Sequence, residues 1–175
     1  MTPDSVEPLF CEADIARRVR DLAREIADGI PGDFTIVAVL KGSFVFVADL
    51  VRALDALGRR SRIDFIRLSS YGADTTSSGE VRLAGAAPAG IAGRKVLLVD
   101  DIVDTGRTLV YARELLEAQG AQEVWTCALV DKPSRREVDF TADFVGFVVP
   151  DIFVVGYGID YAEEYRHLPY IGALR

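Results

Sequence analysis

Two adjacent aspartates, Asp100 and Asp101, end an apolar run in the segment VLLVDDIVDTGRTL, which extends from Val96 to Leu109. Neighbouring carboxylates repel each other unless a cation or hydrogen-bond donors lie between them. The hydroxyls of a ribose, or a Mg²⁺ ion bound to a ligand, would meet that need. The pair therefore predicts a site for a sugar, a magnesium ion or both.

A short polar turn, from Asp104 to Thr108, follows the pair. Thr105 and Thr108 supply hydroxyls, Gly106 permits close backbone approach, and the start of a helix leaves backbone N–H groups free. Such a turn is suited to bind a phosphate. The alternative is an ordinary strand-to-helix turn in which the Asp104 side chain caps the helix.

The composition restricts the class of protein. A chain of 175 residues, half of them hydrophobic, is expected to form one globular domain over residues 1–175. A net charge of −7 and a pI near 4.8 argue against a protein that coats nucleic acid. We therefore expect small molecules or copies of this chain as partners.

The cysteines and the histidine exclude several kinds of site. Cys11 and Cys127 match no zinc or Cys-x-x-Cys spacing and are expected to be free thiols in a reducing compartment. His167 is the only histidine, which argues against a multi-histidine metal centre and a Ser-His-Asp triad. We expect no signal peptide and no membrane span, and hence a cytoplasmic protein without a membrane partner.

Apolar periodicity predicts alternating helices and strands. An amphipathic pattern predicts a helix over residues 12–28, and a buried strand over 35–40 is followed by a Lys-Gly-Ser turn and a helix over 44–57. Residues 69–79 are small and polar and are expected to form a mobile loop. The further strands are predicted at 63–68, 80–83, 96–99, 124–130 and 152–155, with a possible edge segment at 144–149 and a helix at 107–119.

This alternation predicts an α/β fold, a doubly wound and mostly parallel sheet with helices on both faces. Ligands of such sheets bind beyond the carboxyl ends of the strands. The conspicuous polar residues follow predicted strands and should converge on that edge: Lys41, Ser70, Tyr71, Asp100, Asp101, Asp104, Lys132, Asp160 and Arg166.

The pattern Asp-Asp-x-x-Asp-Thr-Gly-x-Thr after an apolar strand resembles the phosphoribosyl pyrophosphate loop of the type I phosphoribosyltransferases. The rest of the chain resembles the bacterial hypoxanthine-guanine members of that family. The blocks that carry the resemblance are VLKGSFVF (39–46), SSYG (69–72), TSSGEV (76–81), DKPSRR (131–136), VPDIFVVGYGIDY (149–161) and LPYIG (168–172). Two departures are small, because Asp100 replaces a frequent glutamate and the position of Arg107 varies in the family.

The resemblance implies the type I phosphoribosyltransferase fold, with a small hood formed by the chain ends. It implies Mg²⁺-dependent transfer of a phosphoribosyl group to hypoxanthine or guanine, with release of pyrophosphate. It also suggests a homodimer or homotetramer.

The resemblance further implies roles for individual residues. Phosphoribosyl pyrophosphate would be bound by Lys41, Gly42, Asp100, Asp101, Asp104, Thr105, Gly106, Arg107, Thr108 and Arg166. The purine would be bound by Lys132, Phe153, Val154 and Asp160, Mg²⁺ by Asp100, Asp101 and Asp160, and Ser70 and Tyr71 would begin a loop that closes over the sugar. Asp104 is the expected catalytic residue, because a carboxylate within reach of the purine N7 can accept a proton or stabilise the positive ring.

Residue type alone leaves simpler alternatives open. Lys41, Arg166 and Lys132 could be solvated surface charges, Asp160 a solvent-facing loop acid, and Phe153 a core residue. Another base is also conceivable: Asp104 and Lys132 argue against adenine and uracil, whereas xanthine is less well excluded. A regulator on the same fold that senses phosphoribosyl pyrophosphate or binds RNA is a further alternative, which the intact acids and the negative net charge disfavour.

Overall fold

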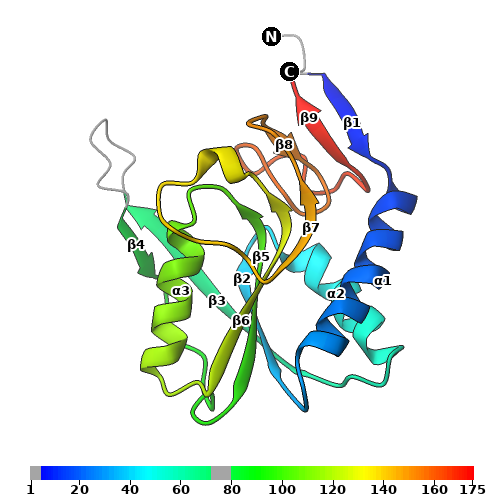
Figure 1. Cartoon of the computed structure of the whole chain (residues 1–175). Helices are drawn as coiled ribbons and strands as arrows, with labels where there is room; N and C mark the ends of the chain where they lie inside the picture. Colours follow the sequence, from blue (N-terminus) through cyan, green and yellow to red (C-terminus); the bar gives the residue numbers. More distant parts are fainter. Residues whose placement is uncertain (1–4, 72–79) are drawn as a thin grey trace.

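The computed structural model describes residues 5–71 and 80–175, and its centre is a six-stranded sheet with the order β4-β3-β2-β5-β6-β7 (Figure 1). All neighbouring strands are parallel except β4, which is antiparallel to β3. The predicted, mostly parallel α/β sheet is thus confirmed. Its strands are β2 (Thr35–Leu40), β3 (Arg62–Tyr71), β4 (Glu80–Leu83), β5 (Lys95–Val103), β6 (Glu123–Asp131) and β7 (Phe144–Val148).

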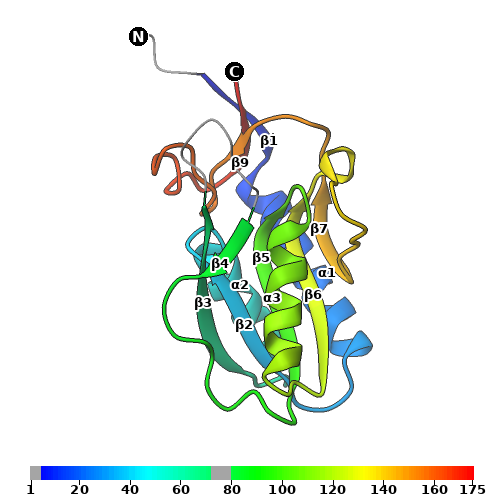
Figure 2. The same ribbon diagram turned by 90° about the vertical axis from the view of Figure 1, so that its left-hand side faces the viewer.

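Helices cover both faces of this sheet, as predicted. Helices α1 (Glu12–Gly29) and α2 (Phe44–Asp55) lie on one face and α3 (Arg107–Ala118) lies on the other (Figure 2). The central strand β5 contributes to both cores, because successive side chains of a strand point to opposite faces. Leu97 and Val99 pack in the core under α1 and α2, whereas Val96 and Leu98 pack in the core under α3.

The two ends of the chain form a second, three-stranded antiparallel sheet, which is the predicted hood. Its strands β1 (Val6–Phe10), β9 (Ile171–Leu174) and β8 (Val154–Val155) pair in that order. The predicted strand at 152–155 is therefore wrong in extent and place, because only two of its residues pair, and they pair with β9. The edge segment at 144–149 is instead the edge strand of the central sheet, β7.

Two predicted strand ends were also wrong. The strand expected to end at residue 99 continues to Val103, so Asp100 and Asp101 lie inside β5 rather than beyond it. The reason is tertiary pairing, because β6 continues alongside β5. Ala128 of β6 pairs with Asp100, and Asp131 of β6 pairs with Val103. Strand β3 likewise continues to Tyr71 by pairing with β4, so Ser70 and Tyr71 belong to a strand. The rest of the predicted loop, residues 72–79, lies outside the described residues.

The helix ends agree closely with the sequence. Helix α2 ends at Asp55 and α3 at Ala118, one or two residues before the predicted ends. Gly120, which follows α3, has a φ of +87°, as expected for a glycine just beyond a helix. Within residues 5–71 and 80–175, no helix has the length and hydropathy needed to cross a membrane.

A close approach of two glycines joins the carboxyl edge of the sheet to the segment that follows β8. Gly158 has a φ of +98°, and a Cβ atom there would lie 2.4 Å from the carbonyl oxygen of Gly42. A Cβ atom on Gly42 would in turn lie 1.7 Å from Oδ2 of Asp101. The turn after β2 is therefore held between β5 and the 156–170 segment by contacts that only glycine permits.

We predict that Gly158→Ala destabilises the protein more than a matched substitution elsewhere. Gly90 has a φ of +69° and open space around it, so Gly90→Ala isolates the backbone strain, about 1–2 kcal/mol. Gly158→Ala adds the clash with Gly42, and overpacking of this kind costs about 1–3 kcal/mol more. Urea unfolding of both variants measures the difference, and equal losses of unfolding free energy would contradict the close approach.

Candidate active site

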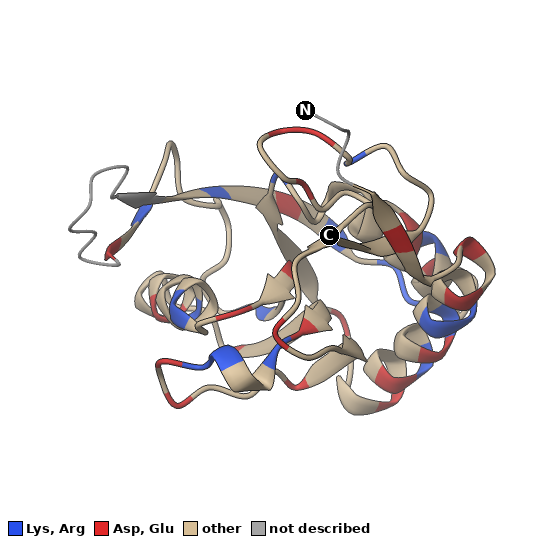
Figure 3. Cartoon of the chain, turned by 90° about the horizontal axis from the view of Figure 1, so that it is seen from above, with Lys and Arg blue, Asp and Glu red and all other residues tan. Residues whose placement is uncertain are grey.

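The polar residues predicted to converge do gather at the carboxyl edge of the sheet. Lys41 follows β2, Asp100 and Asp101 lie near the carboxyl end of β5, and Lys132 follows β6. The segment that carries Asp160 and Arg166 leaves the hood and reaches the same edge, where Gly158 contacts Gly42. Figure 3 views the molecule from above, with its acidic and basic residues coloured.

The aspartate pair on β5 is an unfavourable arrangement of charge, with Asp100 buried and Asp101 half-buried. Asp100 is only 5% exposed, and burial together with the charge of Asp101 raises the pKa of its carboxyl well above the usual value. Burial also raises the pKa of Asp101, although the nearby Arg166 opposes the shift. The backbone N–H of Asp101 donates to Asp100 Oδ1, and that of Ile102 donates to Asp101 Oδ1, both at 2.9 Å. A cation or several hydroxyl donors would relieve this repulsion.

A network of charges connects the turn after β2 to the 156–170 segment. The turn begins with a cis peptide bond between Leu40 and Lys41. Lys41 Nζ lies 2.7 Å from Glu163 Oε2, and Arg166 Nη2 lies 3.4 Å from Glu163 Oε1 and 3.0 Å from Asp160 Oδ1. The hydrogen bond from Lys41, followed by the charges of Lys41 and Arg166, lowers the pKa of Glu163. Lys41 and Arg166 thus lie close enough to contact one shared anion.

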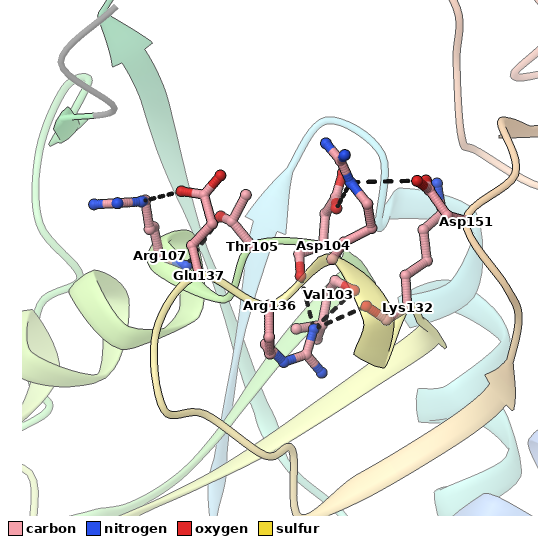
Figure 4. Close-up of polar contacts among 9 residues, drawn as sticks. Val103, Asp104, Thr105, Arg107, Lys132, Arg136, Glu137 and Asp151 are labelled. Atoms are coloured by element: carbon pink, nitrogen blue, oxygen red, sulfur yellow. Dashed lines mark hydrogen bonds and ion pairs between the residues drawn. The ribbon is translucent and has the colours of Figure 1, made fainter.

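The turn after β5 leads into α3 through Gly106, which is the N-cap residue and has a φ of +89°. The Thr105 hydroxyl accepts a bond from the Arg107 N–H at 3.3 Å, and the Thr105 carbonyl accepts one from the Glu137 N–H at 3.0 Å. Arg107 also pairs with Glu137 at 2.8 Å (Figure 4). The alternative that Asp104 caps the helix is wrong, because Gly106 holds that position and no side-chain cap bond is formed.

The Asp104 carboxylate is held by an arginine that sequence reasoning did not predict. Its Oδ1 accepts a hydrogen bond from Arg135 Nε at 3.1 Å, while Arg135 also lies 3.7 Å from Asp151 (Figure 4). The Asp104 side chain is 44% exposed. It therefore has a fixed partner on one side and remains accessible to a ligand.

A second unpredicted arginine, Arg136, joins the ends of β5 and β6. Its Nη1 donates to the carbonyl of Asp104 at 2.7 Å and to that of Val103 at 3.3 Å, and its Nε donates to Phe140 O at 3.0 Å. Its guanidinium also pairs with the buried carboxylate of Asp131. The sequence carries no local signal for this role, because the groups that Arg136 contacts on Val103, Asp104 and Phe140 come from other segments.

A lysine and a phenylalanine form the other side of the site. Lys132 is only 6% exposed, and its Nζ lies 5.7 Å from the ring centroid of Phe153. Phe153 is 52% exposed and meets Tyr161 edge to face, with 5.3 Å between centroids. The surface alternative for Lys132 and the core alternative for Phe153 are both wrong. Val154 is buried in β8, and Tyr161 is an aromatic neighbour that sequence reasoning missed.

The expected metal ligands do not form a closed cage. Within residues 5–71 and 80–175, no group of three or more acidic, histidine or cysteine side chains could hold a metal ion. Mg²⁺ in phosphate sites typically takes one or two carboxylates and completes its shell with water and substrate phosphates. The repelling pair Asp100 and Asp101 and the carboxylate of Asp160 fit that kind of site.

A cavity of about 710 Å³ lies beside this edge, between α1, α2 and the 157–169 segment. Its walls include apolar side chains such as Ile15, Val19 and Phe44, and Arg166 is the one predicted site residue that lines it. Its lining does not include the aspartates of β5. We therefore place the chemistry at the carboxyl edge of the sheet and not in this groove.

Comparisons with known proteins show the family to which the chain belongs. A family model described as the phosphoribosyl transferase domain matches residues 9–162. The chain is 44% identical to the hypoxanthine-guanine phosphoribosyltransferase of Bacillus subtilis, over all of this chain and 96% of that protein. It is 43% identical to the hypoxanthine phosphoribosyltransferase of Escherichia coli K12, over 96% and 94% of the two chains.

A solved structure shows the same fold. The hypoxanthine-guanine phosphoribosyltransferase of Bacillus anthracis, with a HEPES molecule in its active site, superposes with a TM-score of 0.89 at 42% identity, over 97% of this chain and 98% of that one. The chain therefore belongs to the phosphoribosyltransferase family, with bacterial hypoxanthine-guanine phosphoribosyltransferases among its relatives.

Proposed function

We propose that the protein transfers a phosphoribosyl group from phosphoribosyl pyrophosphate to hypoxanthine or guanine, forming IMP or GMP and pyrophosphate in purine salvage. One observation carries the proposal: the buried residue Lys132 has its ammonium beside the exposed ring of Phe153, and its backbone N–H donates to Val103 at the end of β5, the strand that carries Asp100. A hydrogen-bond donor, a stacking face and a set of carboxylates are what a 6-oxopurine and a ribose need. The relatives and the family model support the same reaction.

Lys132 and Phe153 would select and hold the base. A lysine ammonium has three donors and no acceptor, so it suits the O6 acceptor of an oxopurine and meets the amino group of adenine as donor against donor. Phe153 offers an exposed aromatic face for stacking. The backbone of Val154 and the Asp160 carboxylate would complete the purine site.

The sugar and its phosphate would lie along β5 and the turn that follows it. Asp100 and Asp101 would accept hydrogen bonds from the ribose hydroxyls, which satisfies the buried carboxylates. The hydroxyls of Thr105 and Thr108, with the backbone of Gly106, would hold the 5′-phosphate at the start of α3. Arg107 lies in the same turn and would add a positive charge.

Lys41, Gly42 and Arg166 would bind the pyrophosphate. Asp100, Asp101 and Asp160 would supply carboxylate ligands to a Mg²⁺ ion, and such an ion would supply positive charge to the pyrophosphate leaving group. Lys41 and Arg166 orient the same group from the turn after β2 and from the 156–170 segment. Ser70 and Tyr71 at the end of β3 would begin the loop that excludes water from the reacting sugar, as closing loops do in other enzymes.

Asp104 would act on the purine proton. As N9 forms its bond to the sugar, the ring must lose a proton, and a carboxylate beside N7 can accept it or stabilise the positive ring. The hydrogen bond from Arg135 fixes the orientation of the Asp104 carboxylate. Acidic groups near C1′ also stabilise the positive charge that the ribose develops in the transition state.

The proposal also includes the domain organisation, cellular compartment, oligomeric state and partners of the protein. Residues 1–175 act as one phosphoribosyltransferase domain in the cytoplasm, as a homodimer or homotetramer, without nucleic-acid or membrane partners. The acidic charge of the chain argues against a nucleic-acid partner, and the name of its relative specifies small-molecule substrates.

A panel of bases with Mg²⁺ and phosphoribosyl pyrophosphate tests the reaction. We expect turnover with hypoxanthine or guanine and a kcat/KM for adenine lower by about 10⁴-fold, because a site built on one hydrogen bond rejects the base that cannot make it. Lys132→Ala should lower kcat/KM for the oxopurines by about 10- to 150-fold. Lys95→Ala is the control, since Lys95 starts β5 at the other end of the strand and donates to Pro31 O. Comparable rates with adenine and hypoxanthine would contradict the role of Lys132, and a preference for xanthine would change the assigned base.

The second prediction concerns Asp104. Asp104→Asn should lower kcat by roughly 10²- to 10⁴-fold while binding of phosphoribosyl pyrophosphate stays nearly intact, because the amide keeps an oxygen for Arg135 but cannot take a proton. Asp151→Asn is the matched control, since Asp151 also lies beside Arg135. Steady-state kinetics and calorimetric binding separate the two effects. A normal kcat in Asp104→Asn would leave the residue with a structural role alone.

The third prediction is that Asp100→Asn stabilises the free protein while abolishing turnover. The folded state raises the pKa of Asp100, so folding binds a proton and stability falls as pH rises above the ordinary carboxyl range. Removing the charge should therefore add about 0.5–2 kcal/mol at neutral pH and nothing in acid. Asp143→Asn is the contrasting variant and should destabilise, because Asp143 accepts bonds from the Thr126 N–H and hydroxyl. Thermal unfolding at several pH values measures both, and a destabilised Asp100→Asn at neutral pH would refute the repulsion.

A further inference from the structure

Glu163 forms ion pairs with the two cations that the proposed function assigns to pyrophosphate. Its Oε2 lies 2.7 Å from Lys41 Nζ and its Oε1 lies 3.4 Å from Arg166 Nη2, so each oxygen of one carboxylate faces a different cation. Lys41 follows β2 and Arg166 lies on the 156–170 segment, and Glu163 is the anion that both contact. A carboxylate that bridges two phosphate-binding cations imitates the anion they are expected to bind.

We infer that Glu163 is an internal substitute for pyrophosphate, a carboxylate that sets the affinity of the site by competing for Lys41 and Arg166. This inference rests on the proposed function, because it takes those two side chains as the pyrophosphate ligands. In the free protein Glu163 forms an ion pair with each of them. When pyrophosphate or phosphoribosyl pyrophosphate binds, the carboxylate must leave both cations.

The local structure allows the side chain to leave without disturbing the backbone. The Glu163 side chain is 64% exposed, so it can turn into solvent. Its backbone has a φ of +68° and stays attached through its N–H, which donates to Asp160 Oδ2 at 2.8 Å. The exchange therefore needs a rotation of one side chain and no movement of the chain.

The two cations differ in how firmly they are held. Arg166 donates to the Gly158 carbonyl at 2.9 Å, pairs with Asp160, and has a buried Nε with no hydrogen-bond partner in the described part of the chain. It is fixed before a ligand arrives. The Lys41 side chain is 48% exposed, and within residues 5–71 and 80–175 the one ion pair it forms is with Glu163. Glu163 thus keeps a flexible ammonium beside a fixed guanidinium, in position for the anion.

Such a competitor has a consequence for the reaction. Pyrophosphate is a product with several negative charges, and cations that bind it too tightly would slow its departure. A carboxylate that returns to both cations stabilises the state in which the product has left. Glu163 therefore weakens pyrophosphate binding and favours product release.

Calorimetric titration of the full-length protein with pyrophosphate and Mg²⁺ tests the inference, with Glu163→Gln and Glu163→Ala as variants. Each removes the charge, and the measured Kd should fall by about two- to tenfold, the range expected for removing exposed ion pairs. Glu164→Gln is the matched control, because it removes the same charge one residue away. In the described part of the chain, ion pairs to Lys41 and Arg166 are formed by Glu163 and not by Glu164. Its Kd should stay within twofold of the wild-type value.

A second experiment repeats the pyrophosphate titration in the Lys41→Met background. In that background Glu163→Gln should lower the Kd by less, because one of the two contested cations is gone. In the wild-type background Glu163→Gln should also lower the KM for phosphoribosyl pyrophosphate. Damage to the structure would weaken binding, so it has the opposite sign.

The outcomes separate this inference from the proposed function. A wild-type protein that turns over oxopurines and binds pyrophosphate, but whose Glu163 variants bind it equally or more weakly, would overturn the role of Glu163 alone. A wild-type protein that binds neither pyrophosphate nor phosphoribosyl pyrophosphate would overturn both. Equal tightening in Glu164→Gln would overturn the specific competition and leave only the loss of overall negative charge.

Discussion

The burial of two adjacent carboxylates at the end of the central strand is the constraint on which the rest of the site depends. Strand β5 lies between β2 and β6, so Asp100 cannot turn toward solvent as a residue of an edge strand could. Two like charges in such a place destabilise the free protein, and a structure keeps such an arrangement where the ligand relieves it. Among the cations at this edge, Arg166 lies near enough to Asp101 to oppose the rise in its pKa.

Three arginines at this edge are each positioned by a carboxylate or a carbonyl from another part of the chain. Arg136 ties the end of β5 to the end of β6 through the Asp104 carbonyl and the Asp131 carboxylate, and Arg135 holds the Asp104 side chain itself. Arg166 is fixed by the Gly158 carbonyl. Because the partners come from separate parts of the chain, the site is ordered before a ligand binds, and an acidic protein presents a local set of positive charges.

The sequence predicted the parts of this arrangement that have a local cause. An apolar run buried on both faces identifies a central strand such as β5, and Asp104 to Thr108 carries its chemistry within five residues. The strand ends were wrong because pairing with β6 extends β5 to Val103. Strand β1 was missed because its backbone pairs with β9, more than 150 residues away. Arg136 and Glu163 were missed for the same reason, since an arginine bound to distant carbonyls and an exposed glutamate have no local signature.

The site divides into two halves. Lys132, Phe153 and Tyr161 form the half suited to a flat base, and Lys41, Glu163 and Arg166 form the half suited to a multiply charged anion. The edge-to-face contact of Phe153 with Tyr161 connects the two halves, because Tyr161 lies in the same 156–170 segment as Glu163 and Arg166. The 156–170 segment therefore contacts both halves, and Gly158 fixes it against the turn after β2. A ligand that occupies one half acts on the same segment that forms part of the other, so the segment provides a physical route for the two binding events to affect each other.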